Sequence, residues 1–375
     1  MLESVVSARN AVIGFCYRRI LKPVFFLMDP EFIHNRFLGV GKFLGAGPFR
    51  KAFTRGLFYY RHPALRQTVR GIEFPNPIGL AAGFDKNAIL TDILPAVGFG
   101  FAEVGSITGD PCKGNEGKRL WRLIKSQSLL VYYGLKNDGS EAIAKRLTHK
   151  KFEIPIGISV AKTNCPATVE MEKGIEDYGK AYRAADPVAA YITINISCPN
   201  AFGGEPFTDP ARLDLLLTHV RSCHGTKPIF LKMPADIGEQ EIDGIIQVAR
   251  RHRIDGFVCS NLTKNRNNPL IKDANVPTSG GMSGKVEDEL TTNMVRTVYR
   301  KTRGEFTIMG CGGVFSAEDA YKKIRAGASL IQMITGMIFE GPQVVSEINQ
   351  GLVKLLKRDG FKNISEAVGA DHRTV

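Results

Sequence analysis

The sequence lacks the usual signatures of disulfide-bonded, zinc-binding and membrane-spanning proteins. Its seven cysteines include no Cys-x-x-Cys pair, and no His/Cys group has zinc-site spacing. An odd number of scattered thiols predicts a reducing intracellular setting, in which most of them are small buried residues. No run of about 18 uncharged apolar residues occurs, so we expect no spanning helix. No small-residue cleavage site follows the N-terminal apolar patch, so we expect no cleaved signal peptide.

The chain also lacks a Gly-x-Gly-x-x-Gly turn after its first strand-like run, which argues against the alternative of a doubly wound open sheet. Apolar runs that predict strands cover 78–83, 101–106, 156–160, 191–197, 229–233, 256–261, 307–312 and 330–335. Amphipathic patterns that predict helices lie between them, for example over 87–97, 210–222, 239–252, 287–302, 317–326 and 342–357. This alternation predicts an α/β fold, a (β/α)8 TIM barrel over residues 71–375.

The pattern of residues 1–70 predicts a separate helical extension, with one helix over 11–28. A second helix is expected to begin at Pro30, with Asp29 as its N-cap. This segment carries 12 Lys/Arg and three acidic residues, which is most of the chain's net charge of +13. Large apolar residues lie among the basic ones, which is typical of a helix at a membrane surface rather than of a nucleic-acid interface. Ordinary helices packed against the barrel are the alternative.

The most distinctive chemistry follows the strand-like run at 191–197. Asn195, Cys198 and Asn200 come together where the run ends, with Pro199 fixing the turn. In a parallel barrel, the C-terminal ends of the strands form the active site. The pattern therefore predicts hydrogen-bonding groups and a potential base around a planar ligand.

Two lysines and several glycines lie at or near the C-terminal ends of other predicted strands. Lys86 follows the small residues 81–83, and Lys232 lies within an apolar strand, where it is expected to face the barrel mouth. Glycines at 310–313, after the seventh strand, predict a phosphate site of the kind common in this barrel corner, with Ser316 as the cap of the next helix. The long segment 262–285 contains a second glycine cluster and is expected to close over the same site.

Together these motifs resemble the dihydroorotate dehydrogenases, FMN enzymes on a (β/α)8 barrel, and the likeness covers nearly the whole chain. The N-terminal extension, with LMDPE at 27–31 and His34, is similar to the membrane-associated, quinone-linked class. The motifs that carry the resemblance are NPIGLAAGFDK at 76–86, GFGFAEVGS at 98–106, NISCPN at 195–200, SGGMSGK at 279–285, IRAGAS at 324–329 and GADHR at 369–373.

The resemblance implies oxidation of dihydroorotate to orotate in pyrimidine biosynthesis, with quinone as electron acceptor. Cys198 would be the base, no metal or nucleic acid is involved, and His34 and Arg122 match the quinone side. The protein would be peripheral to a membrane, either the inner face of a bacterial cytoplasmic membrane or the mitochondrial inner membrane. The implied FMN contacts are Ala82, Gly83, Ser106, Ser159, Asn195, Lys232, Ser260, Gly284, Gly313, Ile334 and Thr335. The implied substrate contacts are Lys86, Asn195, Asn200 and Asn261.

The chain departs from the family pattern at several of these positions. Cys198 replaces the serine of the quinone-linked class, and a thiol, with a pKa of about 8.5, is a better base near neutrality. Val131, Leu135 and Leu262 replace polar or aromatic residues, while Lys136 could pair a substrate carboxylate. These changes leave open another dihydropyrimidine or cyclic imide as substrate, and a soluble acceptor. A non-catalytic or RNA-binding barrel is a third possibility.

Overall fold

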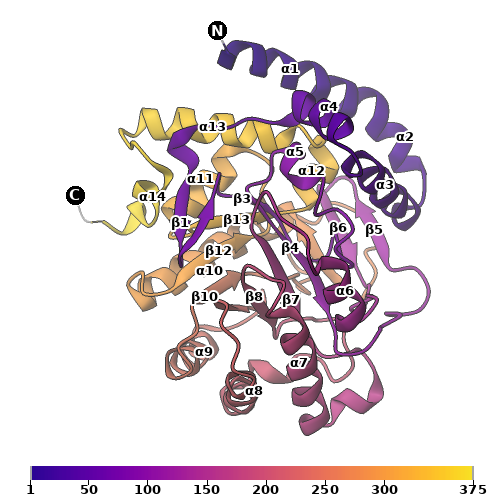
Figure 1. The fold of residues 1–375 in the computed structure, drawn as a ribbon, viewed down its shortest axis with the longest axis vertical. Coiled ribbons are helices and arrows are strands. Elements are labelled where there is room, and N and C mark those ends of the chain that lie inside the picture. Colours follow the sequence, from indigo (N-terminus) through magenta and orange to yellow (C-terminus); the bar gives the residue numbers. More distant parts are fainter. Residues whose placement is uncertain (1, 374–375) are drawn as a thin grey trace.

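The computed structural model describes residues 2–373, and its centre is a closed barrel of eight parallel strands (Figure 1). All eight strand predictions are confirmed, with ends that differ by up to three residues. Around the barrel the strands follow their order in the chain, and the last pairs with the first, with Ile331 opposite Ile78. The strands are β3 (Ile78–Leu80), β4 (Phe101–Ile107), β7 (Ile156–Val160), β8 (Ile192–Asn195), β9 (Ile229–Lys232), β10 (Gly256–Cys259), β12 (Thr307–Cys311) and β13 (Leu330–Met333).

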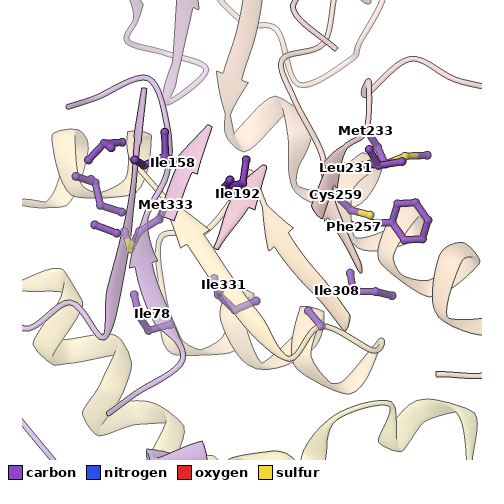
Figure 2. Close-up of a cluster of buried hydrophobic side chains, with 14 of the residues drawn as sticks. Ile78, Ile158, Ile192, Leu231, Met233, Phe257, Cys259, Ile308, Ile331 and Met333 are labelled. Carbon is purple, nitrogen blue, oxygen red and sulfur yellow. The ribbon is translucent and has the colours of Figure 1, made fainter. Parts of the chain in front are cut away.

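Alternate residues of each strand face opposite sides of the barrel wall. One set packs against the surrounding helices in the main apolar core, and Figure 2 shows members of it on neighbouring strands, among them Ile192, Leu231 and Ile331. The other set points inward and begins with large apolar residues such as Phe101 and Phe230. A hairpin of β1 (Gln67–Val69) and β2 (Ile72–Phe74) packs against these inward residues and covers the barrel's N-terminal end.

Toward the C-terminal ends of the strands the inward-facing residues become polar. Glu103 is fully buried, and one of its carboxyl oxygens accepts hydrogen bonds from Thr193 and Gln332, both at 2.9 Å. Asn195 and Lys232 lie one step further along β8 and β9 and form a register pair. The interior is therefore apolar at its closed end and polar where the strands open.

The predicted helices are confirmed except the first. Residues 87–93 are not helical, and α5 is limited to Leu94–Val97. The Asp85 carboxylate instead accepts hydrogen bonds from the backbone N–H groups of Ile89 and Leu90, which holds this segment as a turn. The confirmed helices are α8 (Pro210–Ser222), α9 (Glu239–Arg251), α10 (Asp288–Thr302), α11 (Ala317–Arg325) and α13 (Val344–Arg358). The structure adds α6 (Ser140–Leu147), α7 (Met171–Ala185), α12 (Thr335–Glu340) and α14 (Ile364–Ala367).

The N-terminal extension comprises α1 (Leu2–Cys16), a π-helical turn (Tyr17–Leu21), α2 (Lys22–Leu27), α3 (Pro30–Gly45) and α4 (Pro48–Phe58). The first helix starts at residue 2, earlier than the predicted 11, whereas Asp29 caps α3 as expected by accepting from the N–H of Phe32. These helices lie beside α12 and α13 (Figure 1). Within residues 2–373, no helix is both long and apolar enough to cross a bilayer.

A small antiparallel sheet lies outside the barrel. It consists of β5 (Leu120–Leu123), β6 (Ser128–Val131) and β11 (Gly281–Gly284). The strand β11 ends the long segment 262–285, which is attached to the β5–β6 turn by hydrogen bonds from the backbone and hydroxyl of Ser126 to Asp273. The segment is therefore a fixed part of the wall around the barrel mouth.

Candidate active site

A deep cavity opens at the C-terminal ends of the strands and contains about 1240 Å³ of space not filled by atoms, its mouth included. Residues at or just beyond the ends of β3, β4, β8, β9, β10, β12 and β13 line it. Helix α3 adds His34, and the outer sheet adds Val131 and Gly284. This position at the strand ends is where (β/α)8 enzymes place their chemistry. The predicted base Cys198 and every predicted FMN and substrate contact line this cavity except Ser159.

One wall of the cavity combines a cation with a chain of hydroxyl and amide groups. Lys232 is only 5% exposed and lines the cavity, as its position within an apolar strand predicts. Asn195 donates to the Ser106 hydroxyl at 2.8 Å, and Ser106 in turn lies 2.7 Å from the Ser159 hydroxyl. Ser159 is therefore placed behind Ser106 and supports it, instead of facing the cavity as the resemblance implies.

A corner rich in glycine lies between β12, β13 and β11. Gly284 and Gly313 both have positive φ angles (99° and 71°), and a Cβ on Gly313 would lie 2.3 Å from the Cα of Asp288. Only glycine fits there, so the backbone itself forms the cavity wall. The Thr335 hydroxyl lies 2.8 Å from that of Ser283 in the same corner. Ser316 caps α11 as predicted, through a capping box with Asp319.

Lys86 approaches the cavity from the loop after β3, with its ammonium group 3.8 Å from the centre of the Tyr133 ring. Burial lowers the pKa of Lys86 to about 7, and repulsion from Lys136 and Arg119 acts in the same direction. Glu31 and Asp85 oppose this shift. Lys86 is thus only partly charged near neutrality, and a bound anion would hold it in its charged form.

Cys198 lies beside a second hydrogen-bond network and is partly buried. Asn261 donates to the backbone carbonyl of Ser197 at 2.6 Å, and Ser197 donates to the side chain of Asn195 at 3.1 Å. The thiol lines the main cavity and also a smaller one that it shares with Lys162. The network fixes the strand end from which the Cys198 side chain reaches the cavity.

The protonation of Cys198 differs from the expectation of a thiol near its ordinary pKa. Burial raises the pKa of the Cys198 thiol to about 11, and Glu205 adds to this, whereas a backbone hydrogen bond from Asn200 and the charges of Lys162 and Lys232 oppose it. The thiol is therefore protonated near neutrality in the described conformation. A local sequence pattern does not show how much water the folded chain excludes from a side chain.

The outer part of the cavity is less polar than the cavity end near Lys232. Val131, Leu135 and Leu262 all line it. Asn200 lines it too, but its amide donates to the Val131 carbonyl at 3.0 Å. Lys136, considered as a partner for a substrate carboxylate, lies 3.6 Å from Glu31. The Asn200 amide and the Lys136 ammonium are thus already paired with other groups of the protein.

Helix α3 contributes the remaining wall. Burial lowers the pKa of His34 to about 3, with Lys86 and Lys136 adding to the effect, so the ring is neutral. Its ring meets Phe84 edge-on at 4.9 Å. Arg122, which matches the quinone side of the family pattern, does not line the cavity. Arg122 instead donates to the Met28 carbonyl at 2.7 Å and fixes the end of α2.

Sequence reasoning missed Tyr133, Gln332 and Glu287, which all line the cavity. Gln332 could have been found, because it is the polar residue of the eighth strand and follows Leu330 at the two-residue spacing of the inward face. Tyr133 and Glu287 lie outside the barrel strands, where no local periodicity indicates the direction of a side chain.

Comparison with known proteins agrees with this geometry. The model of the family described as "Dihydroorotate dehydrogenase" matches residues 64–356. Proteins named dihydroorotate dehydrogenase (quinone) from Natronomonas pharaonis and Parvibaculum lavamentivorans are 36% and 37% identical to the chain. Each alignment covers 94% of this chain and 99% or 98% of the relative. A mitochondrial protein of that name from Arabidopsis thaliana is 35% identical over 95% of this chain and 82% of its own length.

Solved structures give the same result. The Eimeria tenella DHODH complex with ferulenol superposes with a TM-score of 0.83 at 28% identity, over 92% of this chain and 96% of that chain. The match of the family model over most of the chain, the relatives above one-third identity and the closed barrel agree with one another. The chain belongs to the dihydroorotate dehydrogenase family.

Proposed function

We propose that this protein oxidises dihydroorotate to orotate with FMN as cofactor and passes the electrons to a quinone. The main support for this proposal is that Lys86, Cys198 and Lys232 all line one cavity. The relatives of the chain are named for the same activity. The three groups supply a cation for an anionic substrate, a potential base and a buried cation for the cofactor.

The chemistry of the lining fits FMN. Lys232 offers a positive charge at the buried end, while Ser106, Ser260 and the amide of Asn195 offer hydrogen bonds to a polar ring edge. The small residues Ala82 and Gly83 line the β3 side and leave room for a flat ring to approach the backbone. The backbone of Gly284 and Gly313, with Thr335 and Ile334 beside it, would hold the phosphate. When bound, FMN supplies the acceptor for the two electrons that leave the substrate.

The remaining steps belong to side chains of this chain. The Lys86 ammonium would attract the substrate carboxylate, and Asn195, Asn200 and Asn261 would orient the ring. The Cys198 sulfur, as thiolate, would take up the proton from C5, and C6 would lose a hydride that carries both electrons to the cofactor. Its raised pKa makes the thiolate scarce near neutrality, but the thiolate that does form is a correspondingly stronger base.

The apolar residues Val131, Leu135 and Leu262 favour one alternative, an FMN enzyme of the same fold that acts on another dihydropyrimidine or cyclic imide. A buried substrate carboxylate that finds no hydrogen-bond donor at such a position is destabilised by about 1–3 kcal/mol for each donor it lacks. A soluble acceptor remains the alternative to quinone.

The substrate assignment is tested by anaerobic titration of the purified protein. We expect bound FMN whose visible absorbance is bleached stoichiometrically by dihydroorotate, because the substrate's two electrons pass to the flavin. A parallel set of dihydropyrimidines and cyclic imides should bleach it much more slowly. If dithionite bleaches the flavin but excess dihydroorotate does not, the substrate assignment is wrong.

Replacing Cys198 by Ala should leave FMN bound and slow flavin reduction by about 10²–10⁴-fold, because the general base is lost. Stopped-flow absorbance under anaerobic conditions measures this rate. Cys223→Ala is the matched control, since Cys223 caps α8 and does not line the cavity. A Cys198→Ala rate equal to that of the wild type would remove Cys198 from the mechanism.

Binding of the product orotate should weaken as pH rises, because Lys86, with its pKa of about 7, loses its charge. We expect the dissociation constant to be constant below about pH 7 and to rise about tenfold per pH unit above it. Flavin absorbance changes on orotate titration measure the constant. Lys86→Met should bind weakly without this pH dependence. A wild-type constant that stayed flat to about pH 9 would contradict the role of Lys86.

Peripheral membrane attachment through the N-terminal helices is part of the proposal. Leu27 and Phe49 are each 89% exposed, and exposed apolar side chains lie along α1 to α4 among the basic residues. Such a surface suits the interface of an anionic bilayer. The other apolar residues exposed on these helices include Val5, Val12, Phe15, Ile20, Val24, Phe32, Phe37, Val40, Phe43 and Phe53.

The double substitution Leu27→Glu with Phe49→Glu should strongly reduce cosedimentation with anionic lipid vesicles, because it places acidic groups on the apolar surface. Turnover of a long-chain quinone should fall, while turnover of a soluble acceptor should be preserved. Leu215→Glu, at an exposed apolar residue of α8, is the control and should change neither result. Unchanged vesicle binding by the double variant would contradict membrane attachment through these helices.

A further inference from the structure

A second buried ionisable side chain faces the cavity near Lys232. Glu287 ends the short 3-10 turn Lys285–Glu287 before α10, lines the cavity and is only 2% exposed. One carboxyl oxygen, Oε2, would lie 3.1 Å from a Cβ atom added to Gly312. The other oxygen, Oε1, has no hydrogen-bond partner among the described residues. The carboxyl group therefore lies against the end of β12 with one oxygen uncommitted.

Lys232 is the charge that acts most strongly on Glu287. The charges of Lys232 and Glu287 both act on the pKa of the Cys311 thiol, at the end of β12. The two residues therefore lie near the same part of the cavity wall. Within residues 2–373, however, no ion pair joins the Lys232 ammonium to the Glu287 carboxyl. Both residues line the same cavity, and each retains the capacity to interact with a bound ligand.

A carboxylate is costly to bury when one of its oxygens accepts no hydrogen bond and no ion pair neutralises it, so this group is expected to hold a proton. Burial raises the pKa of Glu287 well above its usual range. Asp236 acts in the same direction, while Lys232, Lys323 and the Thr263 backbone N–H oppose it. A protonated carboxyl has a hydrogen to donate, whereas an ionised one would repel negative charge.

We propose that Glu287 is a neutral carboxylic acid that donates a hydrogen bond to the bound cofactor beside Lys232 and so favours its reduced, negatively charged form. This inference rests on the proposed FMN function. Reduction by two electrons with uptake of one proton leaves one negative charge on the flavin. A cation and a neutral donor fixed next to each other stabilise that charge more than the cation alone.

The test compares FMN midpoint potentials for Glu287→Gln, Glu287→Leu and the wild type at neutral pH, by anaerobic equilibration with a reference dye. Glu287→Gln keeps a neutral donor, so its ratio of reduced to oxidised flavin at a fixed potential should stay within about threefold of the wild type. Glu287→Leu removes the donor, and the ratio should fall about tenfold, which corresponds to about 30 mV for a two-electron couple. Glu289→Gln is the control, because Glu289 is exposed and pairs with Lys322 outside the cavity.

Two results would overturn the proposal. A Glu287→Leu potential equal to that of the wild type would show that Glu287 has no influence on the flavin. A tenfold higher ratio in Glu287→Gln would show that Glu287 is ionised in the wild type.

Infrared difference spectra of the wild type, reduced minus oxidised, provide a test that does not require the Leu variant to fold. They should contain a protonated-carboxyl band that shifts on reduction and is lost in Glu287→Gln, and its absence would also reject the proposal. Wild-type protein that binds no FMN would instead refute the proposed function itself. Normal FMN content and bleaching with unchanged potentials would refute only the role of Glu287.

Discussion

The pairing of β13 with β3 is the constraint on which the site depends. Hydrogen bonds between these strands, with Ile331 opposite Ile78 and Met333 opposite Leu80, close the sheet into a cylinder. Closure gives every strand two neighbours and turns alternate side chains inward. It also brings Thr335, near the end of the chain, to the same cavity as Lys86 and Gly83. Without this pairing the glycine-rich corner at Gly313 and Thr335 and the loop that carries Lys86 would belong to opposite edges of an open sheet.

Desolvation at the barrel mouth then sets the charge states of the side chains. Burial is the largest influence on Lys86, His34, Cys198 and Glu287, and it disfavours the charged form of each. The partly neutral lysine, the neutral imidazole, the protonated thiol and the buried acid thus have one physical cause. Lys232 is the fixed cation among them in the proposed chemistry. Because burial disfavours the charged form of each group, an anionic ligand would favour the charged form of Lys86.

The N-terminal helices are attached to the barrel by polar contacts on one side and keep apolar residues exposed elsewhere. Asn10 and Arg9 both donate to the Ser346 hydroxyl on α13, and Tyr17 donates to the Ile338 carbonyl at 2.7 Å. On α3, Glu31 forms an ion pair with Arg119 next to the cavity. The alternative of ordinary packed helices therefore accounts for only part of this segment. The exposed apolar side chains are the part that packing leaves unexplained, and they carry the proposal of a membrane surface.

Local sequence patterns were sufficient for the barrel itself. The eight strands were recognised from apolar runs, and two helix starts from the capping residues Asp29 and Ser316. Both signals lie within a few neighbouring residues, because strand periodicity and capping depend on short-range geometry. The same patterns place Asn195, Lys232 and Gly313 at strand ends, where a parallel barrel opens. Once the barrel was inferred, most of the cavity lining followed from it, and the family resemblance supplied the expected roles.

Only the tertiary structure decided what surrounds each side chain. Asp85 replaced a predicted helix by a turn, Ser159 was placed behind Ser106, and the amide of Asn200 was committed to the Val131 carbonyl. Glu287 reached the cavity from a segment without strand periodicity. The raised pKa of Cys198 has the same origin, because exclusion of water depends on segments far apart in the chain that fold over one point. The sequence by itself determined the strands and where their polar ends lie, whereas solvent exclusion, and with it protonation, was determined by the closed fold.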